Sequence, residues 1–417
     1  MKFYKSLIIV SLIILLKYQL NATQLEKVEP ESVGMSSNRL QSINSTIEEA
    51  ILNKKFPGAV IAISRKGKLV YYESFGWQNY SKKIPMKKDA IFRIYSMTKP
   101  IVSVGAMILN EKGKFHLSEP VHKYLPELRD LQVLKKNNQG VEVLTPVKKT
   151  IKIHDLLRHT SGFTYGVFGS SPAKREIKNS QIGSLNNLDF SLEEYISILA
   201  SLPLAYEPGT HWEYGRSVEV LGRVIEKSSK LKLDEFLQNH IFEPLNMKDT
   251  GFFVNEKNWD RIAEPFSDTG EPELIKIKRP PIFITGGHGL VSTVSDYMNF
   301  CLMLLNQGNF NKKVILGKKT VEYITSDHLG SNINRSGPYY LPGDGYGFGL
   351  GFAVREQNGV SPWPGTKGDY FWAGYAGTYF WIDPEEKLVV VLMTQSVKNR
   401  MKYRKLLRNL VYQSILK

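Results

Sequence analysis

The two ends of the chain carry the hydrophobic patterns of β-strands. Residues 58–64 form an almost continuous apolar run, and residues 69–76 follow it after the polar turn 65–68, which predicts a β-hairpin. Near the other end, three more segments have strand patterns: residues 347–354, 377–382 and 387–394. We therefore expect the two ends of the chain to build one sheet.

Two amphipathic segments lie outside these strands. Residues 37–54 place four aliphatic side chains at helical spacing, and residues 399–416 close the chain with a second apolar stripe and a basic face. The basic face leaves contact with a membrane surface as an alternative. A sheet must bury its apolar face against another layer, so we expect the closing helix to cover the sheet.

The middle of the chain, about residues 98–296, has a different pattern. Helical spacing dominates it, in residues 101–110, 153–158, 192–202, 218–228 and 233–241. Loops rich in Gly, Pro, Ser and Asn separate these segments, and residues 166–187 form one of them. The pattern predicts a helical lobe inserted between the two halves of a sheet lobe.

The first 22 residues have the layout of a secretory signal peptide. Lys2 and Lys5 make the start positive, residues 6–16 form a largely apolar run, and Ala22 offers a cleavage position. The run is shorter than the roughly 20 residues that a membrane span needs. We expect an exported protein, periplasmic or secreted. Because Leu20 suits the cleavage site poorly, an uncleaved membrane anchor is the alternative.

Charge and cysteine content narrow the choice of partners. The chain has 55 Lys and Arg against 40 Asp and Glu, a net charge of +15. The bases are dispersed and no helix interleaves them with aromatic residues, so nucleic acid is not an expected partner. Weak association with anionic envelope surfaces stays open. The single cysteine, Cys301, lies in an apolar run, which excludes an intrachain disulfide and predicts a buried thiol.

Ser96 and Lys99 are the first candidate chemical groups. An extended segment runs into Ser96 and a helix follows it, so Lys99, three positions later, shares a helix face with the serine. A serine hydroxyl is a weak nucleophile that needs an adjacent base, and a desolvated lysine can supply one. Taken alone, a serine at the start of a helix is normally an N-cap, and Ser-x-x-Lys is a weak signal because it is common by chance.

Two further segments add to this pair. Tyr214 lies in an aromatic loop before a helix, where a tyrosine either packs or moves protons. Residues 368–378 are rich in Gly and aromatic side chains, and small residues on a strand allow a close approach to the backbone. An amide at such an edge can donate to an oxyanion, although a bulged strand gives the same pattern.

The order of the three features resembles a known superfamily. Ser-x-x-Lys heading a helix, a later Tyr loop and a Gly-rich strand recur in this order in serine β-lactamases and penicillin-binding proteins. This chain resembles the class C β-lactamase-related branch, which includes the family VIII carboxylesterases. Four segments carry the resemblance, which covers nearly all of the mature chain: residues 92–100, 153–162, 242–247 and 286–290.

The resemblance implies an α+β fold of the β-lactamase/transpeptidase type. It implies an antiparallel five-stranded sheet flanked by helices, together with a mostly helical lobe. One domain would then span residues 23–417 after the 1–22 leader. Its sheet lobe would take about residues 30–97 and 297–417, and its helical lobe about residues 98–296.

The resemblance also implies roles for particular residues. Ser96 would be the acylated nucleophile, and Lys99 and Tyr214 would share the duties of general base and acid. The amides of Ser96 and Tyr375 would form the oxyanion hole. No metal ion and no organic cofactor is implied. His154 and His159 flank an aspartate but lack a further ligand set, so we expect structural roles for them.

Two departures from the β-lactamase pattern bear on the substrate. Arg216 stands where those enzymes carry the Asn of Tyr-x-Asn, and Trp372, Ala373 and Gly374 replace Lys-Thr-Gly. A Trp cannot supply the charge that helps to bind a lactam carboxylate, and the esterases of the family often show Trp-Gly-Gly here. Arg216 could still bind a carboxylate.

We therefore expect a serine hydrolase that acts on small uncharged acyl esters. The alternatives are a β-lactamase or D-alanyl peptide hydrolase, and a penicillin-binding sensor that is acylated without turnover. A purely structural envelope protein is the third reading. The loops at residues 166–187 and 332–343 are expected to shape the pocket.

Overall fold

The structure is a computed structural model that describes residues 25–417, except residues 185, 187–188 and 268–269. The expected leader, residues 1–22, lies outside the described residues. Across the described part of the chain, no helix has both the length and the apolar character to cross a bilayer.

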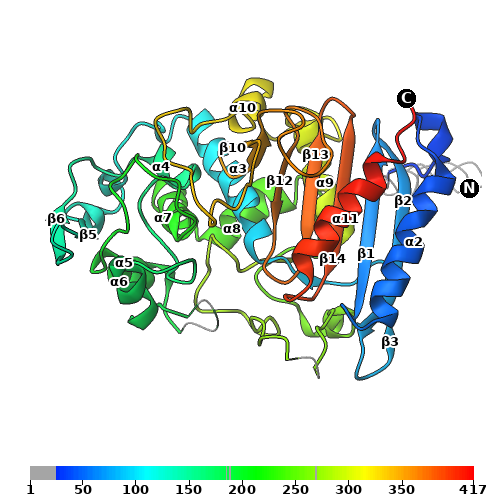
Figure 1. Ribbon diagram of the computed structural model, residues 1–417, viewed down its shortest axis with the longest axis horizontal. Helices are drawn as coiled ribbons and strands as arrows, with labels where there is room; N and C mark the ends of the chain where they lie inside the picture. Colours follow the sequence, from blue (N-terminus) through cyan, green and yellow to red (C-terminus); the bar gives the residue numbers. More distant parts are fainter. Residues whose placement is uncertain (1–24, 185, 187–188, 268–269) are drawn as a thin grey trace, which may run out of the picture.

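An eight-stranded antiparallel sheet forms one side of the molecule (Figure 1). From one edge to the other its strands are β10 (Tyr346–Phe348), β11 (Ala353–Arg355), β12 (Tyr370–Ala373), β13 (Tyr379–Asp383), β14 (Leu388–Thr394), β1 (Gly58–Arg65), β2 (Lys68–Asn79) and β3 (Ile84–Pro85). The two ends of the chain meet in its middle, where Ala59 of β1 pairs with Thr394 of β14 and Arg65 pairs with Leu388.

Both faces of the sheet centre are covered. Every residue of β1 and β14 is buried, which requires a layer on each side of the sheet. Helices α2 (Ser37–Leu52) and α11 (Arg400–Tyr412) lie together on one face, and α9 (Val294–Leu305) packs on the other (Figure 1). The closing helix therefore covers the sheet, and Cys301 is fully buried on α9.

The expected count of five strands is wrong for the edges of the sheet. Residues 347–354 are not one strand: β10 and β11 form a hairpin there, and Gly351, at φ +99°, helps to turn the chain between them. The aromatic segment 370–373 supplies a separate strand, β12, which pairs with β13. The two-residue strand β3 completes the opposite edge. Strands of two or three residues are too short to show an alternating pattern in the sequence.

The helical lobe is built around α3 (Thr98–Glu111). Twelve of its residues, from Thr98 to Leu109, are buried, as expected for a helix enclosed on all sides. It packs against α7 (Ser217–Ser229) and α8 (Leu233–Leu237). The remaining helices of eight or more residues in this lobe are α5 (Pro172–Asn179) and α6 (Leu192–Ala200); α4 (Ile153–Leu157) and a π-turn at Gln238–Phe242 are shorter. A hairpin, β5 (Gln132–Lys136) and β6 (Glu142–Pro146), extends from this lobe.

Helix α5 lies within residues 166–187, which the sequence predicted to be a loop. The Ser171 side chain accepts a hydrogen bond from the Lys174 amide, and Pro172 occupies the first turn, so the helix begins with two standard N-terminal devices. The other short elements are β4 (Phe92–Arg93) paired with β7 (Val291–Ser292), β8 (Asn309–Phe310) paired with β9 (Lys313–Val314), and α10 (Lys318–Ile324).

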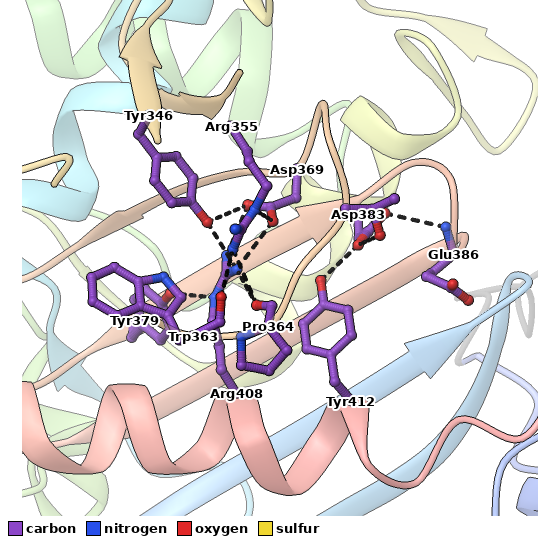
Figure 2. Close-up of polar contacts among 11 residues, drawn as sticks. Tyr346, Arg355, Trp363, Pro364, Asp369, Tyr379, Asp383, Glu386, Arg408 and Tyr412 are labelled. Carbon is purple, nitrogen blue, oxygen red and sulfur yellow. Dashed lines mark hydrogen bonds and ion pairs between the residues drawn. The ribbon is translucent and has the colours of Figure 1, made fainter. Parts of the chain in front are cut away.

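A buried charged network fastens α11 to the edge of the sheet (Figure 2). Asp369 accepts hydrogen bonds from Arg355 Nε at 2.6 Å, from Arg408 Nη1 and Nη2 at 3.1 and 3.0 Å, and from the Tyr346 hydroxyl at 2.9 Å. Each carboxylate oxygen thus receives two donors, which fills its acceptor capacity. Because Asp369 is fully buried, losing one arginine would leave an uncompensated charge in the interior. The network fixes the position of α11 beside the strands that border the candidate site.

Candidate active site

Ser96 lies in a strained turn between β4 and α3. It is the middle residue of a single 3₁₀ turn, Tyr95–Met97, which leads directly into α3. Tyr95, the residue before it, adopts φ +45°, a conformation that side chains other than Gly rarely take. The Tyr95 hydroxyl accepts the Ile275 amide at 2.9 Å, and its ring meets Tyr375 edge-on at 5.5 Å. A strained backbone conformation persists only where surrounding contacts hold it, and such conformations cluster at functional sites.

Lys99 lies one helical turn beyond Ser96 and is almost fully buried. Its Nζ donates to three acceptors: Ser96 Oγ at 3.4 Å, the Tyr165 hydroxyl at 3.0 Å and the Gly287 carbonyl oxygen at 2.7 Å. The two buried contacts, with Tyr165 and Gly287, hold the Lys99 amino group beside the candidate nucleophile. The expected meeting of Ser96 and Lys99 is present in the structure.

Tyr165 and Glu219 extend this chain of hydrogen bonds into the interior. The Tyr165 hydroxyl donates to Glu219 Oε1 at 2.8 Å, and both side chains are buried. Burial acts to raise the pKa of Glu219, but a hydrogen bond from His288 and the charges of Lys99, His288 and Arg216 outweigh it and lower the pKa to about 2. Burial, and next the Glu219 charge, hold the pKa of Tyr165 well above its usual value. A protonated phenol therefore links an ionised carboxylate to the Lys99 amino group.

The Gly-Gly-His-Gly segment at residues 286–289 permits this arrangement. Gly287 supplies the carbonyl that accepts from Lys99, and a Cβ on Gly287 would collide with the Glu219 carboxylate. Only a residue without a side chain can bring this carbonyl to the buried charge pair.

Tyr214 enters the site inside a cage of aromatic rings. Its ring centroid lies 4.9 Å from that of His159 and 5.4 Å from that of Trp372, and Trp372 Nε1 approaches the Tyr214 hydroxyl at 3.4 Å. Lys99 Nζ lies over the face of the Tyr214 ring, 4.8 Å from the centroid. Burial, and next the Lys99 charge, lower the pKa of His159 to about 3, so this imidazole packs as a neutral ring.

The turn between β12 and β13 brings an amide to the nucleophile. In the turn, the Gly374 N–H donates to the Thr378 carbonyl at 2.9 Å, whereas within the described residues the Tyr375 N–H has no acceptor. A Cβ on Gly374 would collide with the carbonyl oxygen of Ile94, two residues before Ser96. Gly374 therefore allows the turn to lie against the serine segment, and a free amide in that place can donate to an oxyanion.

A cavity of about 630 Å³ opens beside these groups. Of the residues that the sequence singled out, Ser96, Tyr214, Trp372, Ala373, Gly374 and Tyr375 line it, and Lys99 lies beneath Ser96. The loops at residues 166–187 and 332–343 contribute Val167, Phe168 and Leu341 to its wall. Basic side chains of α11 line it as well: Arg400, Arg404, Lys405 and Arg408.

Arg216 is the exception among the expected site residues. It is fully buried, and it does not line the cavity. Its guanidinium donates to the Tyr195 hydroxyl and the Ile182 carbonyl and lies over the ring of Tyr165. The structure therefore places Arg216 in the interior, away from the cavity where a substrate carboxylate was expected to meet it. Across the described residues, no group of three or more His, Cys, Asp or Glu side chains gathers as metal ligands do.

Tyr165 and Glu219 are the site residues that sequence reasoning missed. Tyr165 stands in a loop without a motif. Glu219 offered a signal, because it is a lone charge within the apolar helical run 217–222 and a helix face of this kind is normally buried.

These groups support acyl transfer through a serine, which is the chemistry of a serine hydrolase. The chain belongs to the β-lactamase family: the family described as Beta-lactamase matches residues 43–413. Protein Rv1367c of Mycobacterium tuberculosis is 30% identical over 364 residues, which cover 81% of this chain and 85% of that protein. Esterase EstB of Burkholderia gladioli is 26% identical over 393 residues, which cover 88% and 94%.

A solved structure gives the same assignment. EstCE1, described as a hydrolase with promiscuous acyltransferase activity, matches with a TM-score of 0.74 and 25% identity over 90% of this chain and 99% of its own. The expected β-lactamase/transpeptidase-like fold and the esterase-like serine hydrolase class are thus confirmed.

Proposed function

We propose that this chain is a carboxylesterase that hydrolyses small uncharged acyl esters through an acyl-enzyme on Ser96. The contact of Lys99 Nζ with Ser96 Oγ at 3.4 Å, at the base of an aromatic cavity, is the observation that carries the proposal. Trp372 lines this cavity where the β-lactamases have a lysine, so the strand offers no charge to an acyl substituent. The similarity to Esterase EstB supports the same reaction class.

In this mechanism the ester carbonyl carbon meets Ser96 Oγ. The carbonyl oxygen faces the amides of Ser96 and Tyr375, which stabilise the negative charge that develops on it. In the reactive form Lys99 is a neutral amine, and it accepts the Ser96 proton. The Tyr214 hydroxyl gives its own proton to the departing alcohol, and the proton held by Lys99 then restores Tyr214. Water then attacks the acyl-enzyme with the same groups acting in reverse, which releases the acid and restores Ser96.

The direct test compares Ser96→Ala with the wild-type enzyme on p-nitrophenyl acetate and butyrate. Removing the nucleophile should lower kcat/KM by at least about 10³-fold. Ser197→Ala is the matched control, because Ser197 is an exposed serine on α6 whose hydroxyl only contacts the Glu193 carbonyl. Near-normal turnover by Ser96→Ala would contradict the proposal.

A panel with nitrocefin and a D-alanyl peptide separates the ester reaction from its alternatives. Hydrolysis of nitrocefin or the peptide with a higher kcat/KM than the esters would favour a β-lactamase or peptidase. Time-resolved mass spectrometry distinguishes an enzyme from a sensor. A sensor would keep a persistent adduct on Ser96 and release no product. No adduct with any serine-directed probe would favour a structural protein.

Acyl transfer to an alcohol is a second candidate function. The cavity volume of about 630 Å³ exceeds what a short acyl group fills, and drug-sized ligands occupy cavities of roughly this size. EstCE1 combines hydrolysis with acyl transfer. Adding a bulky apolar alcohol to the ester assay tests this function: transfer requires a new ester product at the expense of free acid.

We also propose that the enzyme works outside the cytoplasm. The positive start, the apolar run at residues 6–16 and Ala22 support export. N-terminal sequencing of the protein isolated from an exporting host should begin at Thr23. An intact Met1 in the membrane fraction would instead favour the uncleaved anchor, and an intact Met1 in the cytosol would contradict export.

A further inference from the structure

The peptide between Gly374 and Tyr375 is held at both of its polar ends. Its N–H, on Tyr375, has no acceptor among the described residues, and Tyr375 lines the cavity together with Ser96. Its carbonyl oxygen, on Gly374, accepts a hydrogen bond from Nη2 of Arg404, which reaches the turn from α11. The same Nη2 donates to the Thr378 carbonyl at 3.0 Å, so one guanidinium binds both ends of the turn.

Arg404 lacks the counterion that such a buried cation normally has. It is 8% exposed, and among the described residues no carboxylate lies within ion-pair distance of it. Besides the two carbonyls, its guanidinium meets the Met401 sulfur at 3.6 Å and the ring of Tyr379 at 5.9 Å. Burial, and next the charge of Arg400, lower its pKa. Arg408, one turn further along α11, is instead neutralised by Asp369.

A buried charge without a counterion is costly, so its retention calls for a compensating interaction. A peptide group is a dipole, and a cation on its carbonyl oxygen draws electron density toward that oxygen. The N–H at the other end becomes a stronger donor, as in a chain of polarised hydrogen bonds. The charge acts most strongly when an oxyanion forms in front of that N–H, within the low dielectric of the site.

We propose that Arg404 is a positioning residue of the oxyanion hole, one that fixes the Gly374–Tyr375 peptide plane and strengthens the Tyr375 amide as a donor to the oxyanion. This inference rests on the proposed esterase function. Arg404 acts through the peptide and does not touch the reacting atoms.

The kinetic test uses Arg404→Met, which keeps much of the side-chain length and removes the charge. Because the effect concerns the transition state, kcat should fall about tenfold while KM stays within about twofold. Lys402→Met is the control, since Lys402 is an exposed cation on the same helix that lies over the Tyr403 ring. A fall in kcat matched by Lys402→Met would overturn the inference.

A second measurement needs no substrate. The sequence contains two Gly-Tyr peptides, Gly345–Tyr346 and Gly374–Tyr375, so protein labelled with carbonyl-¹³C glycine and ¹⁵N tyrosine gives two carbonyl–amide NMR signals. In Arg404→Met the Gly374 carbonyl and the Tyr375 amide proton should both move upfield, and the Gly345–Tyr346 signal should stay in place. An unchanged Gly374–Tyr375 signal would overturn the inference.

If Arg404→Met does not fold, the kinetic and NMR measurements are made on Arg404→Lys instead. A lysine side chain is shorter than that of arginine and has a single nitrogen, so its contact with the Gly374 carbonyl would differ and the Gly374–Tyr375 signal must still move. Because the positive charge is kept, kcat must fall by less than tenfold. Equal shifts of both signals would overturn the inference by showing a general disturbance of α11. Absence of ester turnover in the wild type would contradict the proposed function, whereas the NMR result stands apart from it.

Discussion

Lys99 directs a proton to the hydroxyl of Tyr165 and meets only the ring face of Tyr214. Its Nζ lies 3.0 Å from the Tyr165 oxygen, and 4.8 Å from the Tyr214 centroid. Tyr165 passes a hydrogen bond on to Glu219, so the charge of Lys99 is balanced from below. The hydroxyl of Tyr214 has Trp372 as its neighbour, and Tyr214 lines the cavity. In the proposed mechanism the two tyrosines therefore have different tasks: Tyr165 holds the lysine, and Tyr214 meets the substrate.

Tyr165→Phe should impair catalysis more than it impairs the fold. The change removes one acceptor from Lys99 and one donor from Glu219, so the amine loses its fixed direction toward Ser96. We expect kcat for p-nitrophenyl butyrate to fall by about 10–100-fold, a range typical of groups that support a catalytic acid or base. Tyr71→Phe is the control, because this buried tyrosine binds Asn44 in the sheet lobe. Equal kcat values for the two variants would contradict the assigned role of Tyr165.

Glu219→Gln should lower the free energy of unfolding at neutral pH. The pKa of Glu219 is about 2, so the wild-type carboxylate is ionised and offsets the nearby charges of Lys99 and Arg216. Removing one partner of a buried charged group costs about 3–5 kcal/mol. Urea unfolding of the wild type and the variant at pH 7 measures the difference. A loss of under about 1 kcal/mol would show that Glu219 does not balance these cations.

Asp296 should make stability fall as the pH rises from about 4 to 6. Burial, the largest effect on this carboxyl of α9, raises its pKa from 3.8 to about 6. The folded state therefore holds a proton that the unfolded state releases, so the stability from this group is complete below pH 4 and is lost through pH 6. The shift corresponds to about 3 kcal/mol.

Asp296→Asn tests this pH effect. An asparagine keeps an oxygen that can accept from the Asp249 amide and the Thr250 hydroxyl, which both bind Asp296 Oδ2. The stability of the variant relative to the wild type should rise between pH 4 and pH 7, as measured by urea unfolding at both values. A difference that stays constant with pH would refute the assignment.

Gly374→Ala should abolish most of the activity. The new methyl group would collide with the Ile94 carbonyl and the Thr378 side chain, which forces the turn away from Ser96. Displacing an oxyanion donor costs about 10²–10³-fold in kcat. Gly251→Ala is the control, since its Cβ would meet only the Phe253 carbonyl at 3.8 Å. Activity of Gly374→Ala within tenfold of the control would show that the turn tolerates a side chain.

The sequence predicted the parts of the fold that depend on long hydrophobic patterns. The strands β1 and β14, the covering helices α2 and α11 and the core helix α3 all have runs of seven or more residues, long enough for periodicity to identify them. The edge strands β10, β11 and β3 are too short for this, so the expected sheet was too small. Helix α5 begins with a cap and a proline inside a polar segment, where periodicity gave no signal.

The candidate site also has a part that the sequence predicted and a part that it did not. The three-residue spacing of Ser96 and Lys99 fixes their neighbourhood through helix geometry alone. Arg216 was expected in the pocket, but the direction of a side chain at the start of α7 depends on what packs there, and Tyr195 and Ile182 hold it in the interior. Arg404 lies more than 300 residues after Ser96, so only the folded chain brings the two near one cavity.

The site can be complete only after the last part of this chain has been synthesised. Strand β1 pairs with β14, and α11 supplies part of the cavity wall. The nucleophile is synthesised in the first quarter of the chain, whereas the turn that faces it and the helix behind that turn belong to the last fifty residues. A nascent chain on the ribosome therefore carries Ser96 before it has the Gly374–Tyr375 turn. Acyl chemistry that depends on this turn must therefore wait until β12, β13 and α11 have been synthesised and have packed together.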